Sequence, residues 1–232
     1  MSLCASCHSG CCRSFAVPVT GADILRIQSG CGLTFWDFVV RWADEEGNIA
    51  RNHAPQFHFD DEPETPFVIC LMQDDSDYFP ETSRCKFLLE EAPTDEQPLG
   101  TARCGIYNQR PGACRAFPAK LNSTNELAII YDVPATGRDS GHPIHQLCPR
   151  QWTPRDLDPI QQIQDLVVAK YEMNFFHVLA EAWNRQPGPW NLFPDFLKMV
   201  YTNRLRGAGE VDVDEIARET REAPAQFPRI AA

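Results

Sequence analysis

The sequence is short of positive charge. Lysine and arginine together number 21, against 32 aspartate and glutamate residues, which gives a formal net charge of −11. Proteins that bind nucleic acid non-specifically draw their affinity from clustered lysine and arginine side chains that contact phosphates. Attachment to an anionic membrane surface needs basic clusters of the same kind. We therefore expect neither nucleic acid nor a membrane among the partners of this chain.

Long hydrophobic runs are also missing. No apolar stretch approaches the roughly 20 residues that a membrane-spanning helix requires. The first residues lack the charged start and the apolar segment of a secretory signal, because a cysteine-rich stretch occupies that place. The expected location is therefore cytoplasmic, a compartment in which structural disulfides are rare.

Cysteine, in contrast, is abundant, with ten residues in a chain of 232. A chain of this length can bury a sufficient core without covalent cross-links, so metal ligation explains the cysteines better than disulfides do. The first cluster reads Cys4-x2-Cys7-x3-Cys11-Cys12. Two sulfurs three positions apart can reach one tetrahedral ion from a tight turn. A thioredoxin-like redox pair would need a βαβ context, and none precedes residue 4.

A second group of cysteines lies in the middle of the chain. Cys104 and Cys114 belong to the stretch CGIYNQRPGACRAFP, Cys85 precedes this stretch, and Cys148 follows it. These contexts are rich in turns or lie at strand ends, where ligands from separate segments can converge. The sequence therefore predicts eight metal-binding cysteines, namely Cys4, Cys7, Cys11, Cys12, Cys85, Cys104, Cys114 and Cys148.

The remaining two cysteines receive a different interpretation. Cys70 sits inside an apolar run and is expected to be a core thiol, since cysteine is among the most buried residue types. Cys31 lies between two glycines and is interpreted as a core or surface thiol rather than a ligand.

Thiolate ligands accumulate negative charge, which cationic N–H donors would offset. Arg110 and Arg115, in a proline-stiffened loop, are the expected donors.

These residues carry a resemblance to a known family. The N-terminal cluster, the motif Cys-x-Ile-Tyr-x-x-Arg-Pro-x-x-Cys-Arg-x-Phe-Pro and the later cysteine resemble the zinc- or iron-chelating family called CxxCxxCC or YkgJ-like. The resemblance spans residues 4–150 and places the eight family cysteines on the eight named above. One difference is that three residues, not two, separate Cys7 from Cys11. His8 could therefore substitute as a ligand, although we interpret it as a solvated loop residue.

Three functional hypotheses follow. The first is a metal-binding protein that holds an iron–sulfur cluster or zinc, with a redox or metal-handling role; adjacent cysteines and eight thiols favour iron–sulfur. The second is an enzyme, because a relative of the family, a flagellin lysine N-methylase, carries a similar cysteine domain. The sequence shows no glycine-rich nucleotide-binding turn after a strand, so the resemblance of the cysteine domain alone does not carry over an activity. Whether this chain is an enzyme therefore stays open. The side chains to be considered for that role are those of Tyr107, Asp132, His142 and His145.

The two histidines also have a simpler interpretation. His142 and His145 precede Cys148 closely and could extend a metal site, but loop residues in a Gly/Pro-rich turn are the favoured interpretation.

The third hypothesis is an interaction or metal-trafficking module, possible if the C-terminal helices (158–206) dock a protein partner. The apolar stripe of those helices is instead interpreted as core.

The expected fold class is α+β. A cysteine-rich metal-binding domain of short strands and loops at 1–150 would be covered by a helical extension at 151–232. Capping residues and apolar periodicity predict helices after Thr20, at 34–42, from Asp158 to the Pro187 region, at 194–206 and at 210–223. Strands are predicted at 56–59, 67–72, 85–89 and 126–133, with an acidic loop at 73–83.

Overall fold

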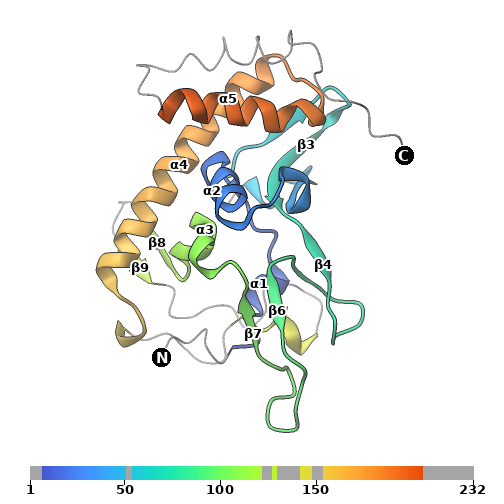
Figure 1. Ribbon diagram of the computed structural model, residues 1–232, viewed down its shortest axis with the longest axis vertical. Coiled ribbons are helices and arrows are strands. Elements are labelled where there is room, and N and C mark those ends of the chain that lie inside the picture. The colour runs from blue at the N-terminus through green and yellow to red at the C-terminus, as the bar shows by residue number, and fades with distance from the viewer. Residues whose placement is uncertain (1–6, 51–53, 122–126, 130–141, 148–153, 206–232) are drawn as a thin grey trace. The chain divides into compact units, whose positions relative to one another are not determined.

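The computed structural model describes residues 7–50, 54–121, 127–129, 142–147 and 154–205 (Figure 1). Short antiparallel strands and loops form its N-terminal part and helices its C-terminal part, so the fold class is α+β as predicted. The chain divides into two compact units that interleave along the sequence, 1–42 with 69–172 and 43–68 with 173–232. A domain boundary at residue 150 stays a prediction.

The first unit is built from short elements. Its helices are α1 (Cys11–Ser14), α2 (Gly21–Cys31) and α3 (Gly112–Ala116), and its 3-10 turns are η2 (Phe35–Asp37), η4 (Tyr107–Gln109), η5 (Pro143–His145) and η6 (Pro154–Asp156). Three antiparallel two-stranded sheets pair β4 (Gln73–Asp75) with β5 (Ser83–Cys85), β6 (Leu88–Glu90) with β7 (Ala102–Cys104), and β8 (Ala119–Leu121) with β9 (Leu127–Ile129).

Helix α2 forms where the sequence predicts it. The Thr20 hydroxyl oxygen accepts a hydrogen bond from the Asp23 N–H at 3.3 Å, and the Asp23 carboxylate accepts one from the Thr20 N–H at 3.1 Å. This reciprocal capping box satisfies two backbone donors at the helix start. At the other end Gly32 has φ +67, a left-handed conformation that glycine adopts without strain. Ile24 and Ile27 provide the buried face.

The helix predicted from Thr34 to Trp42 is wrong beyond its first turn. The Asp37 carboxylate accepts a hydrogen bond from the Thr34 N–H, with 2.7 Å between Oδ2 and the nitrogen. The helical turn, η2, ends at Asp37. The chain then enters strand β1 (Val39–Ala43), in a three-stranded sheet of order β1-β3-β2. β-Branched residues such as Val39 and Val40 favour strands, and pairing in the sheet overrides the helical spacing of the aromatic residues.

The strand predictions are confirmed with altered bounds; of the strand predicted at 126–133, only β9 (Leu127–Ile129) lies within the described residues. The 56–59 strand is β2 (Phe57–Phe59), and the 67–72 strand is the longer β3 (Glu62–Leu71). The 85–89 strand is split, because the chain leaves β5 at Cys85 and begins β6 at Leu88. The 73–83 segment contains β4 and the start of β5, so it is more ordered than the predicted loop.

Helix α4 (Pro159–Arg185) begins as predicted, with the Asp158 carboxylate oxygen accepting hydrogen bonds from the N–H groups of Ile160 at 3.0 Å and Gln161 at 3.2 Å. Helix α5 (Phe193–Leu205) confirms the helix predicted at 194–206, and the helix predicted at 210–223 lies outside the described residues. A short turn, η7 (Trp190–Leu192), separates α4 from α5.

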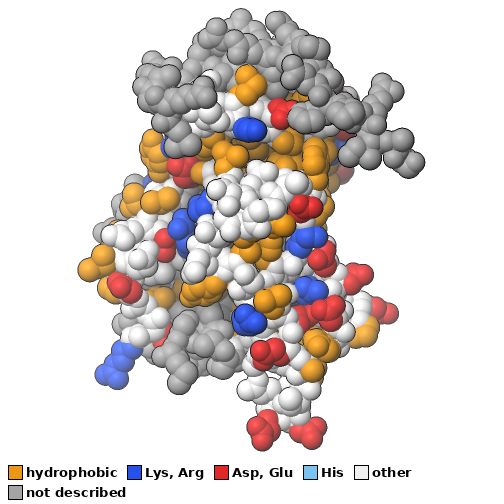
Figure 2. Space-filling model, viewed as in Figure 1, with side chains coloured by type: hydrophobic (Ala, Val, Ile, Leu, Met, Phe, Trp, Pro, Cys, Tyr) orange, Lys and Arg blue, Asp and Glu red, His pale blue; other side chains and the backbone are white. Residues whose placement is uncertain are grey.

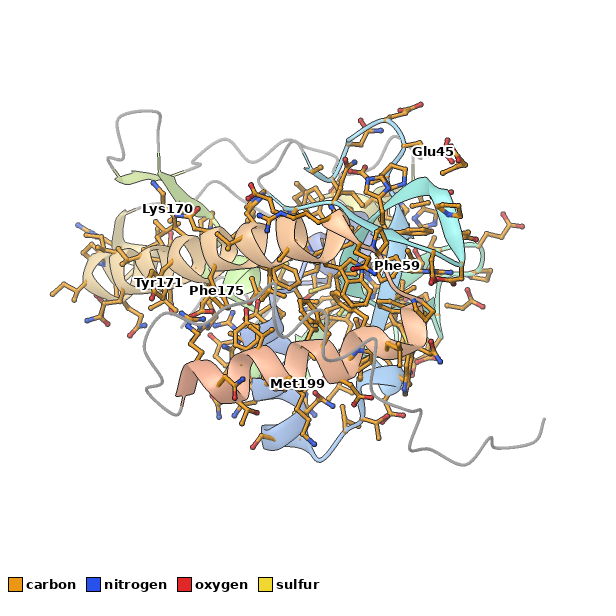
Figure 3. The ribbon with its side chains drawn as sticks, turned by 90° about the horizontal axis from the view of Figure 1, so that it is seen from above. Glu45, Phe59, Lys170, Tyr171, Phe175 and Met199 are labelled. Carbon is orange, nitrogen blue, oxygen red and sulfur yellow. The ribbon has the colours of Figure 1, made fainter. Side chains whose placement is uncertain are left out.

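The second unit has an aromatic core between β2, α5 and the end of α4. Trp183 on α4 donates its indole N–H to the His58 carbonyl at 2.8 Å. The Asn184 side-chain oxygen accepts a hydrogen bond from the His58 N–H at 2.9 Å, and its amide nitrogen donates to the Gln56 carbonyl at 2.8 Å. Phe175 on α4 packs against Tyr201 on α5, with 5.4 Å between the ring centroids (Figure 3). The buried aromatic residues are Phe57, Phe59, Phe67, Phe176, Trp183, Phe193 and Phe196.

The apolar stripe of α4 is only partly core, which corrects the interpretation of this stripe as buried. Leu166, Phe176, Leu179 and Trp183 are buried, but apolar side chains on another face of the helix are exposed. Figure 2 shows hydrophobic side chains along the left edge, where α4 lies in Figure 1. The exposed apolar residues of α4 are Ile160, Ile163, Val167, Val168, Tyr171 and Val178.

Candidate metal centre

Helix α1 presents the adjacent cysteines Cys11 and Cys12 from a single turn. The turn forms because the Cys12 N–H donates to the Ser9 carbonyl at 2.9 Å and the Arg13 N–H donates to the Gly10 carbonyl at 3.1 Å. Ser9 itself has φ +58, which reverses the chain between Cys7 and the helix. The additional residue in the Cys7-x3-Cys11 spacing is thus accommodated in a tight bend before α1.

His8 is buried, which corrects its interpretation as a solvated loop residue. Its side chain is 7% exposed, and Nε2 lies 2.6 Å from the Gln146 carbonyl oxygen. Burial lowers the pKa of His8, the hydrogen bond to Gln146 opposes this shift, and the Arg13 charge adds to it. The contact ties the N-terminal cluster to the segment that precedes Cys148, although Cys148 and Cys4 lie outside the described residues.

Two hairpins position Cys85 and Cys104. Cys85 is the last residue of β5 and pairs with Gln73, and Cys104 is the last residue of β7 and pairs with Leu88. The Cys7 carbonyl accepts a hydrogen bond from the Ala102 N–H at 3.0 Å, so the N-terminal segment runs beside β7. Cys7 is buried, and its sulfur accepts a hydrogen bond from the Ser9 N–H at 3.3 Å.

Cys114 lies on helix α3, which is packed against α2 on one side and α4 on the other. The Gly112 N–H donates to the Asp23 carboxylate at 3.0 Å, which fixes the start of α3 against α2. A Cβ on Gly112 would lie 3.2 Å from the Ala169 side chain, so glycine permits close packing against the first part of α4. Pro111 directly precedes the first residue of α3.

Five of the eight predicted ligands influence one another electrostatically. Burial raises the pKa of Cys114 well above its usual value, and the charges of Cys85, Cys11 and Cys104 raise it further. Burial also raises the pKa of Cys85 to about 11 and that of Cys104 in the same direction, with Cys11 acting on both thiols. The fifth member is Cys12, on which Cys11, Cys114 and Cys85 act. Thiols from four separate segments are thus close enough for their charges to act on one another.

A hydrogen bond joins the side chains of Cys11 and Cys12. The side-chain hydrogen bond between them lowers the pKa of Cys11 and raises that of Cys12, with burial adding to the Cys12 shift and opposing the Cys11 shift. The two neighbouring sulfurs therefore lie within hydrogen-bonding reach of each other.

Arg110 supplies the positive charge beside the thiols. Its charge acts to lower the pKa values of Cys11, Cys104 and Cys114, although other contributions dominate each shift. The guanidinium lies 3.8 Å from the Tyr107 ring centroid, and its Nε donates to the Tyr107 carbonyl at 3.1 Å. These contacts hold the Arg110 guanidinium against Tyr107, and the role of Arg110 as a cationic donor to thiolates stays a prediction.

Arg115 is placed differently from Arg110. Its Nη1 lies 3.8 Å from the Asp165 carboxylate on α4, and its carbonyl accepts a hydrogen bond from the Gln162 amide at 3.5 Å. These contacts attach α3 to α4. A role for Arg115 in offsetting thiolate charge stays a prediction.

A buried ion pair behind α1 was not predicted from the sequence. Arg13 and Glu90 lie 2.5 Å apart with both side chains 1% exposed, and Arg84 Nε lies 3.0 Å from the same carboxylate. Burial alone would raise the pKa of Glu90, but hydrogen bonds from the Asp77 N–H, the Ser76 hydroxyl and Arg13 lower it overall. Arg13 directly follows the cysteine pair, but nothing in the local sequence indicates a partner 77 positions away.

The other candidate side chains are dispersed. Tyr107 is exposed and stacks on Arg110, and Asp132 lies outside the described residues. His142 Nδ1 accepts a hydrogen bond from the Ile144 N–H at 3.1 Å, and His145 is buried. Cys70 is fully buried in β3, which confirms it as a core thiol.

The described part of the chain contains no group of three or more His, Cys, Asp or Glu side chains that could hold a metal ion. It also contains no disulfide among its cysteines, which are Cys7, Cys11, Cys12, Cys31, Cys70, Cys85, Cys104 and Cys114. None of the helices in the described ranges is both long and apolar enough to cross a membrane.

One comparison with known proteins gives a match. The CxxCxxCC family, described as "Putative zinc- or iron-chelating domain", matches residues 3–132, which is more than half of the chain. The matched span holds all the predicted ligands except Cys148. No curated protein and no solved structure matches the chain. The chain therefore belongs to the CxxCxxCC family of zinc- or iron-chelating domains.

Proposed function

We propose that the gathered cysteines hold an iron–sulfur cluster or zinc, with iron–sulfur favoured, and that the protein serves in redox chemistry or metal handling. The ligands would be Cys11, Cys12, Cys85, Cys104 and Cys114, together with Cys4, Cys7 and Cys148. The observation that carries this proposal is the gathering of five thiols from four segments inside one compact unit.

The donor set suits such metals. Thiolates are the ligands of iron–sulfur clusters and of closed structural zinc sites. Burial and the charges of neighbouring thiols raise the pKa values of Cys85 and Cys114. Ionising these two thiols is therefore costly. A cation among them would offset that cost, and Arg110 would offset part of the remaining negative charge.

The choice of iron–sulfur over zinc rests on the number and adjacency of the thiols. A single zinc ion takes four ligands, whereas eight thiols with two adjacent sulfurs suit a centre with several metal ions. With zinc bound instead, the group would act as a folding clamp, worth on the order of 10 kcal/mol to the folded state. With iron and sulfide bound, it would also supply one-electron chemistry.

Metal analysis of protein purified under anaerobic conditions tests the proposal. Iron with acid-labile sulfide and a brown colour would support the iron–sulfur form, and stoichiometric zinc in a colourless protein would support the zinc form. Undenatured protein with neither metal would overturn both forms. Cys114→Ser should lower the metal content, and Cys70→Ser, which changes a core thiol of β3, should leave it unchanged.

A further inference from the structure

One face of helix α2 contacts the loop that joins two of the predicted ligands, Cys104 and Cys114. The Asp23 carboxylate oxygen Oδ1 accepts a hydrogen bond from the Gly112 N–H at 3.0 Å. Asp23 is buried in the first turn of α2, and Gly112 is the first residue of α3, two positions before Cys114. This contact therefore ties the helix that carries Cys114 to the start of α2.

Arg26 makes the next contact along α2. Its Nη2 donates to the Arg110 carbonyl at 2.9 Å and lies 2.7 Å from the same carboxylate oxygen of Asp23. Side chains three positions apart lie on one face of a helix, so Asp23 and Arg26 reach the loop from the same side. One nitrogen thus links the carboxylate to the loop, and α2 binds two backbone groups of the loop, at 110 and at 112.

The rest of the loop is also held before any metal is considered. A Cβ on Gly30 would lie 2.7 Å from the Gln109 side chain, so the last turn of α2 packs against η4. The Gly105 N–H donates to the Phe87 carbonyl at 2.8 Å, which holds the end near Cys104 beside the start of β6. The loop is therefore anchored at both ends, by a hairpin and by α2.

Such anchoring matters for metal binding because of conformational entropy. Ligands on a mobile loop lose backbone freedom when they bind an ion, and that loss weakens binding. A loop held by α2 has already lost this freedom on folding. Removing the contacts from α2 should therefore weaken metal binding although no donor atom is removed.

We propose that Asp23 and Arg26 are positioning residues of the metal centre, which hold the 110–112 backbone in place for metal binding by Cys104 and Cys114. The inference rests on the proposed metal-binding function. Neither side chain ligates the metal, since both act through backbone groups of the loop. The ion concerned is zinc or iron, because thiolates are soft donors.

Zinc affinity of the full chain, measured by competition with a chelator in the absence of oxygen, tests the proposal. Asp23→Ala removes the acceptor for the Gly112 N–H and should weaken zinc binding about tenfold, as substitutions of residues that orient ligands do. Asp23→Asn keeps an acceptor oxygen and should bind zinc more tightly than Asp23→Ala. Arg26→Gln, at a side chain that is 30% exposed, should weaken binding about threefold through one lost hydrogen bond.

Thr20→Val is the matched control, because it disturbs the same helix start and leaves the loop contacts in place. The Thr20 hydroxyl bonds Asp23 Oδ2 at 3.1 Å, whereas the Gly112 N–H bonds Oδ1. The zinc affinity of Thr20→Val should equal that of the parent protein. Equal losses in Thr20→Val and Asp23→Ala would overturn the proposal, because Asp23 would then act only through the stability of α2.

Hydrogen exchange in the metal-free chain gives a readout that a general loss of stability would not reproduce. Arg26→Gln keeps the acceptor of the Gly112 N–H, yet it should speed exchange of this amide about threefold because the loop loosens. The Ala102 N–H, bonded to the Cys7 carbonyl at 3.0 Å, should exchange at its parent rate. Equal acceleration of both amides, or of neither, would overturn the proposal.

The outcomes separate this proposal from the proposed function. If the parent protein binds zinc and the affinity is unchanged in both Asp23→Ala and Arg26→Gln, the positioning role is overturned and the metal centre stands. If Asp23→Ala does not fold, Arg26→Gln decides alone. A parent protein that binds neither zinc nor iron overturns both proposals, and losses that Thr20→Val does not share support both.

Discussion

Gly10 and Gln146 approach so closely that a Cβ on Gly10 would lie 1.7 Å from the Gln146 carbonyl oxygen. The same oxygen contacts His8. We predict that Gly10→Ala lowers the free energy of unfolding by about 3 kcal/mol, because the clash is with backbone and cannot be relieved by a rotamer change. Urea unfolding of the metal-loaded protein measures this effect.

Gly105→Ala is the graded control for this substitution. A Cβ there would lie 3.2 Å from the Phe87 carbonyl oxygen and 3.3 Å from the Leu89 side chain, a tight but nearly permitted fit. The expected loss is about 1 kcal/mol. Equal losses for the two variants would show that the approach of Gly10 to Gln146 is not what constrains the N-terminal cluster.

The buried pair of Arg13 and Glu90 should be needed for stability. We predict that Glu90→Gln lowers the free energy of unfolding by about 3 kcal/mol, because removing one partner leaves the Arg13 charge buried without its counterion. Chemical denaturation gives the value, with the exposed Glu96→Gln as the control. A loss below about 1 kcal/mol, typical of surface pairs, would contradict this expectation.

Arg110 should tune the metal centre. We predict that Arg110→Gln weakens metal binding about tenfold, the lower end of the effects of outer-shell substitutions, because its charge favours the thiolates of Cys11, Cys104 and Cys114. Competition with a chelator measures the affinity. Arg110→Lys should bind metal more tightly than Arg110→Gln, since the charge is kept. Arg155→Gln, at an exposed position, should have no effect.

Metal uptake should release protons near neutral pH. Cys85, Cys104 and Cys114 have raised pKa values, so they are protonated without metal, and ligation requires their thiolates. We therefore expect affinity to fall as pH falls, with one proton displaced from each of these three thiols. Calorimetry in buffers of different ionisation enthalpy counts the protons, and an uptake enthalpy that is independent of buffer would refute this account.

Much of the fold follows from local signals in the sequence. Thr20 and Asp158 mark helix starts that the structure confirms, because a cap depends on neighbours within a few positions. The helix predicted from Thr34 failed because sheet pairing of β1 is a long-range effect that periodicity does not contain. The exposed face of α4 was mistaken for core for a related reason, since spacing identifies apolar faces but not what covers them.

The residue types of the candidate site could be predicted from the sequence, but their geometry could not. Cysteine spacing indicated which residues belong together, and in the structure the charges of five of these thiols act on one another. The partnership of Arg13 with Glu90 and the burial of His8 against Gln146 depend on residues far apart in the sequence.

X-ray absorption spectroscopy at the metal edge of anaerobically prepared protein tests the central claim most directly. The account predicts a first coordination shell dominated by sulfur at about 2.3 Å, with a metal–metal distance in addition if the centre is iron–sulfur. A shell of oxygen and nitrogen, with sulfur absent, would contradict the account, because the metal would then be bound by residues other than the gathered cysteines.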